Sequence, residues 1–170
     1  MAQTFITPQP LTAEAFARFG DVIEITDRKY HFTINDGHTE RYHDLAAVDV
    51  SNNNGRTLIN LFRSTPLAQP IAIKMMERHP LSSQAFIPQG NQPYLVVVAE
   101  AGDFSLETLS IFLASPKQGV NYHAGTWHHY CLALHEQSDF IVIDRGGPGD
   151  NCDVVELDGS LVIEAILPKP

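Results

Sequence analysis

Three histidines stand close together in one short stretch of the chain, "GVNYHAGTWHH" at residues 119–129. His123, His128 and His129 carry imidazole groups, which bind divalent metals and titrate near neutral pH, with an ordinary pKa of about 6.5. The stretch therefore indicates a metal site, an acid–base site or a group of structural side chains. On a β-strand, alternation would turn His129 away from the face of His128, so we interpret His129 as structural.

A second polar group ends the apolar run "IAIKMMERH" at residues 71–79. If this run is one strand, the inward face that starts at Ile71 and includes Met75 continues through Glu77 and His79. A buried carboxylate beside an imidazole is costly unless the two are paired, hydrated or bound to a ligand. The run thus indicates a functional pair, and the alternative is that the strand ends before Glu77 and both groups are solvated.

The run "TLINLFR" at residues 57–63 places Asn60 on one face of an expected strand and Arg63 on the other. One of the two must face inward if the strand is central. Arg63 is the more useful candidate, because a guanidinium can hold a carboxylate through two parallel hydrogen bonds. The alternative is a surface arginine at the end of a strand.

Length and composition favour one domain that handles a small molecule. The chain has 170 residues, enough for one substantial core, and we expect a single domain over residues 1–170. Its formal net charge of −9 disfavours nucleic acid and anionic membranes as partners, because both attract clustered lysine and arginine. No apolar run reaches the ~18 residues of a membrane helix, and we interpret the N-terminus as lacking a signal peptide. The two cysteines form no motif, which predicts a cytoplasmic protein.

Short β-rich runs separated by turn residues fill most of the chain. Near the start, Thr12 can cap a helix over residues 13–19, which Gly20 would end. Residues 27–56 are polar and irregular, so we expect a long loop over one end of the fold. A succession of about ten short strands is typical of a sandwich or barrel and predicts an all-β fold with one short helix. The expected strands cover residues 22–25, 57–63, 71–78, 85–87, 94–99, 109–114, 120–123, 129–134, 140–144, 154–157 and 161–166.

Two motifs resemble those of the cupins. Glu77, His79, Gln84 and Gly90 have spacing similar to the first cupin motif, which supplies two histidines and a glutamate as metal ligands. The resemblance implies a cupin-like β-barrel, a double-stranded β-helix of jelly-roll type. Here, however, Glu77 stands in place of the first histidine and Gln84 in place of the glutamate. A neutral amide is a weak metal ligand, so we predict no required metal and no other cofactor.

The second cupin motif is resembled by Gly119, Gly125 and His128, with His123 where that family has proline. A narrower resemblance covers almost the whole chain, which is similar to the ureidoglycolate lyase family, formerly called ureidoglycolate hydrolase. That family is cupin-like, typically homodimeric, and cleaves (S)-ureidoglycolate to glyoxylate and urea in allantoin and purine catabolism. The matching blocks are "NDGHTERYHDLA" (35–46), "ERHPLSSQAFIP" (77–88), "QGVNYHAGTWHH" (118–129) and "DFIVIDRGGPGDNCD" (139–153).

The resemblance implies acid–base cleavage of a carbon–nitrogen bond in a carbinolamide. A base takes the hydroxyl proton and an acid protonates the departing urea nitrogen. His79, His123 and His128 are the candidate acids and bases. Glu77 could orient a histidine, hold the urea amides or serve as the base. The candidate substrate-binding residues are Arg41 and Arg63 for the carboxylate, Gln84 for the urea or carboxylate group, and Asn35 and Tyr94 for the pocket wall.

Two other functions stay open at this stage. A metal-dependent cupin oxygenase or isomerase acting on another small carboxylate would contain a bound metal and lose activity to chelators. A small-molecule-binding cupin without catalytic activity would bind its ligand without turnover. We also interpret Asp144 and Arg145 as a structural ion pair, with a place in the dimer interface as the alternative.

Overall fold

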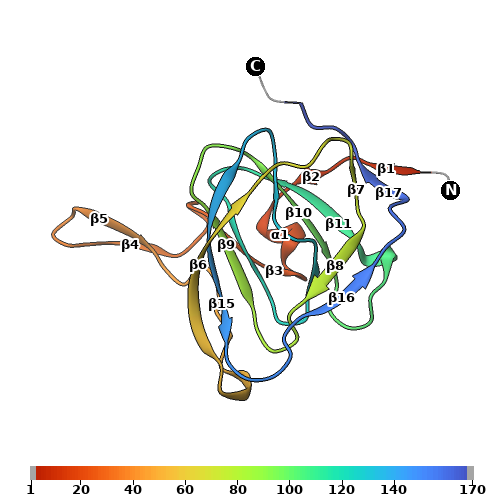
Figure 1. Ribbon diagram of the computed structural model, residues 1–170. Helices are drawn as coiled ribbons and strands as arrows, with labels where there is room; N and C mark the ends of the chain where they lie inside the picture. The colour runs from red at the N-terminus through yellow and green to blue at the C-terminus, as the bar shows by residue number, and fades with distance from the viewer. Residues whose placement is uncertain (1–2, 168–170) are drawn as a thin grey trace.

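Two β-sheets lie face to face and enclose the principal core (Figure 1). The computed structural model describes residues 3–167. Among these residues the larger sheet has seven strands in the order β16-β8-β13-β10-β11-β2, with β14 beside β10. Its strands are β2 (Gln9–Pro10), β8 (Met75–Arg78), β10 (Tyr94–Ala99), β11 (Ser110–Ala114), β13 (Trp127–His128), β14 (Leu132–Ala133) and β16 (Asp153–Glu156).

The facing sheet, within the same described residues, has five strands in the order β3-β12-β9-β15-β6. Strands β15 and β6 pair along their whole length. Strand β9 lies between β12 and β15, so its side chains have neighbours on both sides. The strands are β3 (Gly20–Ile23), β6 (Arg56–Ser64), β9 (Gln84–Pro88), β12 (Gly119–Tyr122) and β15 (Ser138–Gly146).

The remaining elements belong to neither of these two sheets. Strands β1, β17 and β7 form a separate sheet, and β4 and β5 form a hairpin that projects away from the barrel (Figure 1). None of the described helices has the length and apolar character that a membrane span requires. These elements are β1 (Thr4–Ile6), β4 (His31–Ile34), β5 (Thr39–Tyr42), β7 (Ile71–Ala72), β17 (Leu161–Ile163), α1 (Ala13–Phe16), and the 3₁₀ turns η1 (Asn52–Asn54) and η2 (Leu106–Thr108).

Strand β10 separates two cores, because it is buried on both faces. Tyr94, Val96 and Val98 point into the barrel interior, and the alternate residues of the strand point into a second core outside the larger sheet. Ile71 of β7 and Ile163 of β17 help to close this second core. A strand that is buried on both sides has a continuous apolar sequence, as β10 has.

Helix α1 holds Phe16 at the centre of an aromatic cluster inside the barrel. The Phe16 ring lies 5.8 Å from Phe19, 5.7 Å from Phe112 and 6.2 Å from Tyr122, measured between ring centroids. Phe16, Phe19 and Phe112 are fully buried. The three rings approach Phe16 at tilted or edge-on angles, the geometry that aromatic pairs prefer. This aromatic cluster fills part of the barrel interior.

The expected all-β class is confirmed, and the expected helix is present but shorter. The Thr12 side chain caps α1 by accepting a hydrogen bond from the Ala15 backbone N–H at 3.2 Å. The helix ends at Phe16, because the chain then turns into β3 through a bond from the Phe19 N–H to the Phe16 carbonyl at 2.8 Å. Gly20 therefore begins a strand directly after this turn.

The expectation of one strand over residues 71–78 is wrong. Strand β7 pairs with β17 in the outer sheet, whereas β8 pairs with β13 and β16 in the barrel. The chain changes sheets between them, and this break shifts the alternation by one residue. Met76, and not Met75, therefore shares the second core with Ile71 and Ile73. Glu77 faces the barrel interior because β8 pairs with β13 there, and not because it shares a face with Ile71.

Two further expectations need correction. Of the expected strand over residues 129–134, Leu132–Ala133 forms β14, whereas β13 already ends at His128. The two strands pair with different parts of β10 and have residues 129–131 between them. The expected loop over residues 27–56 contains the β4–β5 hairpin, in which Phe32 pairs with Arg41. This hairpin extends outward and does not cover an end of the barrel (Figure 1).

Replacing the buried aromatic ring of Phe112 should destabilise the fold strongly. Phe112→Ala should lower the free energy of unfolding by about 3–5 kcal/mol, because the two sheets cannot collapse fully into the cavity. Urea denaturation followed by circular dichroism measures this. Phe5→Ala is a matched control, since Phe5 is 52% exposed, and it should cost less than about 1 kcal/mol. Equal losses from both variants would contradict the assigned core.

Candidate active site

The inward faces of the two sheets each contribute polar side chains to the same region of the barrel. In the larger sheet, Glu77 of β8 lies directly opposite His128 of β13 in the antiparallel register. In the facing sheet, Gln84 begins β9 and lies beside Asp144 of β15. Gln84 and Asp144 continue the alternation of the core residues on their strands and therefore point inward. The sheet registers thus bring together side chains that are far apart in the sequence.

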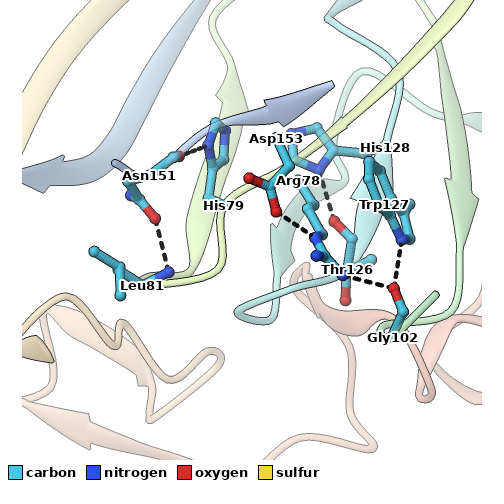
Figure 2. Close-up of polar contacts among 9 residues, drawn as sticks. All are labelled: Arg78, His79, Leu81, Gly102, Thr126, Trp127, His128, Asn151 and Asp153. Carbon is cyan, nitrogen blue, oxygen red and sulfur yellow. Dashed lines mark hydrogen bonds and ion pairs between the residues drawn. The ribbon is translucent and has the colours of Figure 1, made fainter. Parts of the chain in front are cut away.

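Glu77 and His128 form the most buried carboxylate–imidazole pair of the described residues. The Nε2 atom of His128 lies 3.6 Å from Glu77 Oε1, and the His128 side chain is 1% exposed. Its other nitrogen, Nδ1, donates to the Thr126 carbonyl at 3.0 Å (Figure 2). The facing His128 ring lowers the pKa of Glu77 below its ordinary value, and the effect exceeds the opposing effect of burial. Glu77 is therefore a carboxylate at neutral pH.

His79 follows directly after β8 and is held at both ring nitrogens. Its Nδ1 donates to the Asn151 carbonyl at 2.6 Å, and its Nε2 lies 3.2 Å from Gln84 Oε1 (Figure 2 shows the contact with Asn151). The His79 and His128 rings are 5.0 Å apart between centroids. Both ring nitrogens of His79 therefore face oxygen atoms of neighbouring residues.

An aromatic ring packs against His128, and a small cavity opens beside Glu77. Tyr122 stacks on the His128 ring at 4.4 Å with an interplanar angle of 12°. Burial raises the pKa of Tyr122 far above its ordinary range, so its hydroxyl stays neutral. A cavity of about 270 Å³ opens beside Glu77. Its lining residues are Phe62, Arg63, Ser64, Glu77, Phe86, Tyr130 and Cys131.

Of the two residues that could face inward on this strand, Asn60 does so, and Arg63 is the surface arginine of the alternative. Asn60 faces the interior, where it donates to Asp144 at 2.9 Å. Arg63 has the opposite parity and donates two hydrogen bonds of 2.8 Å to the exposed Asp139 carboxylate, although it still reaches the rim of the cavity. The register of β6 with β15 decides between the two, because it places Arg63 opposite Asp139.

The other expected binding residues lie elsewhere in the described structure. Arg41 is on strand β5 of the projecting hairpin, with its guanidinium 5.7 Å from the Phe32 ring. Asn35 is in the turn of that hairpin, where its side chain donates to Thr39. Tyr94 is a core residue, since it is buried, and its hydroxyl donates to the Gln118 carbonyl at 2.7 Å. The structure therefore does not bring these three residues to the cavity beside Glu77.

The histidine-rich stretch divides into separate positions. His128 belongs to the polar cluster, whereas His123 lies 3.2 Å from the Asp21 carboxylate and is half exposed. His129 is buried, and its Nδ1 contacts the Tyr130 carbonyl at 3.1 Å. Trp127 points into the second core and donates to the Gly102 carbonyl at 2.9 Å (Figure 2). One histidine of this stretch, and not a cluster of three, thus faces Glu77 directly.

The polar cluster also has the donor atoms of a metal site. Glu77, His79 and His128 each place one possible ligand atom within 4.8 Å of the others. The buried Nε2 of His128 has no hydrogen-bond partner within residues 3–167. A carboxylate and two imidazoles are ligands that zinc and other divalent transition metals accept. The set therefore fits a divalent cation.

Asp144, Asn60 and Asn151 are polar partners that the sequence did not identify as site residues. Asp144 could have been found from the alternation of β15, because "FIVID" continues an inward row. The expected ion pair of Asp144 with Arg145 is wrong, since the two are strand neighbours that point to opposite faces. Arg145 donates instead to backbone carbonyls of the neighbouring loops.

The fold and the site together define a cupin-like barrel with acid–base side chains in its interior. A family model described as "Ureidoglycolate lyase" matches residues 3–164, so the chain belongs to the ureidoglycolate lyase family. A protein of Burkholderia cepacia named ureidoglycolate lyase is 52% identical over 155 residues, covering 91% of this chain and 87% of that protein. One of Pseudomonas syringae pv. tomato with the same name is 50% identical over 149 residues, covering 87% of each chain.

The reactivity of the Cys152 thiol should depend on the charge of Glu77. Its Sγ lies 4.0 Å from Glu77 Oε2, and burial together with the charges of Glu77 and Asp153 raises the pKa of Cys152. Glu77→Gln removes one of these charges and lowers the thiol pKa. The rate of Cys152 alkylation by iodoacetamide at pH 8, followed by mass spectrometry, should therefore rise by about two- to threefold.

Cys131 provides an internal control for this experiment. Burial raises the pKa of Cys131 to about 12, so a very small fraction of this thiol ionises at pH 8 and its alkylation stays slow in both proteins. An unchanged rate at Cys152 in Glu77→Gln would contradict the assigned contact. Faster alkylation of both cysteines would indicate general loosening of the fold.

Proposed function

We propose that this protein cleaves (S)-ureidoglycolate to glyoxylate and urea. Family membership and the names of relatives at about 50% identity support the reaction. The observation that carries the proposal is the convergence of Glu77, His79 and His128, together with the position of Glu77 in the wall of a cavity large enough for a small molecule. These groups can supply the two proton transfers that this cleavage needs.

The reaction moves one proton from oxygen to nitrogen. The substrate carbon carries a hydroxyl, a carboxylate and a ureido nitrogen. As the carbon–nitrogen bond breaks, its electron pair goes to the nitrogen, which takes a proton and leaves as urea. The hydroxyl loses its proton at the same time and becomes the carbonyl of glyoxylate. A base near the hydroxyl and an acid near the nitrogen lower the barrier, and no electron transfer is involved.

We assign the base to Glu77 and the acid to His79. Glu77 is ionised, since the His128 ring lowers its pKa, and it can accept the hydroxyl proton. His79 has acceptors at both ring nitrogens, so it can hold a proton at Nε2 and deliver it to the leaving nitrogen. His128 lies against Glu77 and stabilises the carboxylate between turnovers. His123 stays a weaker candidate, because its ring pairs with Asp21.

Gln84 and Arg63 are the proposed substrate-binding residues nearest the cluster. The Gln84 amide oxygen lies in the site and can accept from the ureido N–H groups. Arg63 lines the cavity and could share its guanidinium between Asp139 and the substrate carboxylate. Arg41, Asn35 and Tyr94 stay predictions that rest on the family resemblance.

We propose that acid–base catalysis by these side chains requires no metal or organic cofactor. If a divalent cation binds Glu77, His79 and His128, it would polarise a substrate oxygen as a Lewis acid. The same ligand set supports the alternative function, a metal-dependent oxygenase or isomerase acting on another small carboxylate. Metal content and sensitivity to chelators distinguish the two functions.

We propose further that the protein is a homodimer located in the cytoplasm. Ile59 and Leu61, on the outward face of β6, are 76% and 75% exposed. Ile143 and Ile141 of β15 lie directly opposite them, so the four side chains form one apolar patch. A second copy of this chain would remove the patch from water. The free cysteines, Cys131 and Cys152, support a reducing compartment.

Racemic ureidoglycolate should be converted to equal amounts of urea and glyoxylate, because the proposed cleavage breaks one carbon–nitrogen bond and leaves the urea group intact. Protein of known metal content is assayed for urea, glyoxylate and ammonia, before and after chelation, against the spontaneous rate. Turnover should persist after chelation. Ammonia as the product would indicate an amidohydrolase instead, and no turnover would contradict the proposed function. Activity lost on chelation and restored by one divalent cation would assign the three side chains to metal binding.

His128→Ala should reduce kcat/KM by at least roughly 100-fold, the usual scale for losing a general base, because Glu77, the proposed base, loses the ring that stabilises its carboxylate. Steady-state kinetics on folded protein measure this. His135→Asn is a matched control, because His135 has a positive φ of 63° and asparagine tolerates that conformation. The control should keep normal kinetics. A near-normal rate for His128→Ala would remove this residue from the mechanism.

Leu61→Glu should convert the proposed dimer to a monomer, because it places a charge at the centre of the apolar patch. Size-exclusion chromatography with light scattering gives the mass. Leu106→Glu is the control, since Leu106 is 52% exposed but lies in η2, away from β6, and its mass should not change. A wild-type protein that is monomeric at all concentrations would contradict the homodimer.

A further inference from the structure

We propose that Asp144 is a positioning residue that decides which end of the Gln84 amide faces the site. The carboxylate holds the Gln84 NH₂ group on the side of β15, and this leaves the amide oxygen pointing to His79. The consequence for turnover rests on the function proposed above. The orientation itself is a property of the folded protein and can be measured without substrate.

The strand registers place Asp144 beside Gln84. In the ladder between β15 and β9, Ile143 pairs with Ala85 and Val142 with Phe86. One step further along, Asp144 and Gln84 are neighbours on the inward face. The Gln84 side chain is 7% exposed, so water cannot readily satisfy its amide and the protein must provide the partners. Asp144 is the acceptor that the described structure provides for its NH₂ group.

An ionised carboxylate accepts hydrogen bonds and donates none. Within residues 3–167, the side chains that hydrogen-bond to Asp144 are both amides: Asn60 donates to Oδ1 at 2.9 Å, and Gln84 donates to Oδ2 at 3.4 Å. Neither amide can turn its oxygen towards Asp144 without placing two acceptors against each other. The hydrogen bond from Gln84 is long, but its acceptor is a carboxylate, and hydrogen bonds to charged acceptors are stronger than those between neutral groups.

The other end of Gln84 thereby becomes a fixed acceptor. Its Oε1 lies 3.2 Å from His79 Nε2 and can accept from the N–H at that atom. If the amide were reversed, an NH₂ group would face His79 and would oppose the N–H that we assign as the proton donor. The same oxygen would be lost as an acceptor for the ureido N–H groups of the substrate. Asp144 thus acts on the reaction through Gln84 and does not touch the substrate.

A reciprocal exchange of carboxylate and amide tests this arrangement. Gln84→Glu places a second carboxylate against Asp144, so kcat/KM at pH 8 should fall by at least about tenfold. Asp144→Asn gives Gln84 a partner that can donate as well as accept, and kcat/KM should fall by about three- to tenfold. In the double variant, the NH₂ of the new asparagine can donate to the new glutamate, which still presents an oxygen to His79. The double variant should recover to within about threefold of wild type.

Two controls separate positioning from general stability. Asp158→Asn removes one negative charge from an exposed turn and should leave kcat/KM unchanged. Urea denaturation of every variant gives the stability separately from kcat/KM. A double variant no more active than Gln84→Glu, or single variants with wild-type kcat/KM, would overturn the proposal.

Nuclear magnetic resonance decides the orientation even if ureidoglycolate is not turned over. The two side-chain N–H signals of Gln84 are identified by their absence from the Gln84→Glu spectrum. In wild type they should exchange slowly with water, and in Asp144→Asn they should exchange at least about tenfold faster. Wild-type signals at the position and exchange rate of a free amide would overturn the proposal. Absence of turnover with protected Gln84 signals would contradict only the proposed function.

Discussion

The barrel interior has to accommodate the negative charge of Glu77, and much of the surrounding arrangement follows from that requirement. A carboxylate removed from water is costly unless hydrogen bonds or opposite charges compensate it. The register between β8 and β13 places His128 directly opposite, and the lowered pKa of Glu77 reflects this pairing. Strand β13 is hydrogen-bonded to β10, so the packing of β10 on both of its faces also holds Glu77 and His128 in place.

Much of the fold could be predicted from the sequence, because strand alternation and turn residues are local signals. The break between β7 and β8 could not be predicted, because one apolar run contributes strands to two different sheets. The partner strand of β7, β17, lies far away in the sequence. The β4–β5 hairpin was missed for the opposite reason. Its strands are short and mostly exposed, so no clear alternation of apolar residues identifies them.

The candidate site was predictable where its residues follow a motif and not where they depend on long-range register. Glu77, His79, Gln84 and His128 all come from the two cupin-like motifs, and the structure brings them together. The choice between Asn60 and Arg63 depended on how β6 pairs with β15, which a single strand cannot indicate.

Asp144 also gives a physical reason for the amide at position 84. In the cupin motif this position carries a glutamate, and here that side chain would lie against a carboxylate already placed on β15. Two ionised carboxylates at this distance repel each other, and one of them would have to bind a proton. An amide avoids the conflict, because its NH₂ group satisfies Asp144 and its oxygen still faces His79. The site therefore keeps an acceptor at position 84 and leaves the second carboxylate, Glu77, on the larger sheet beside His128.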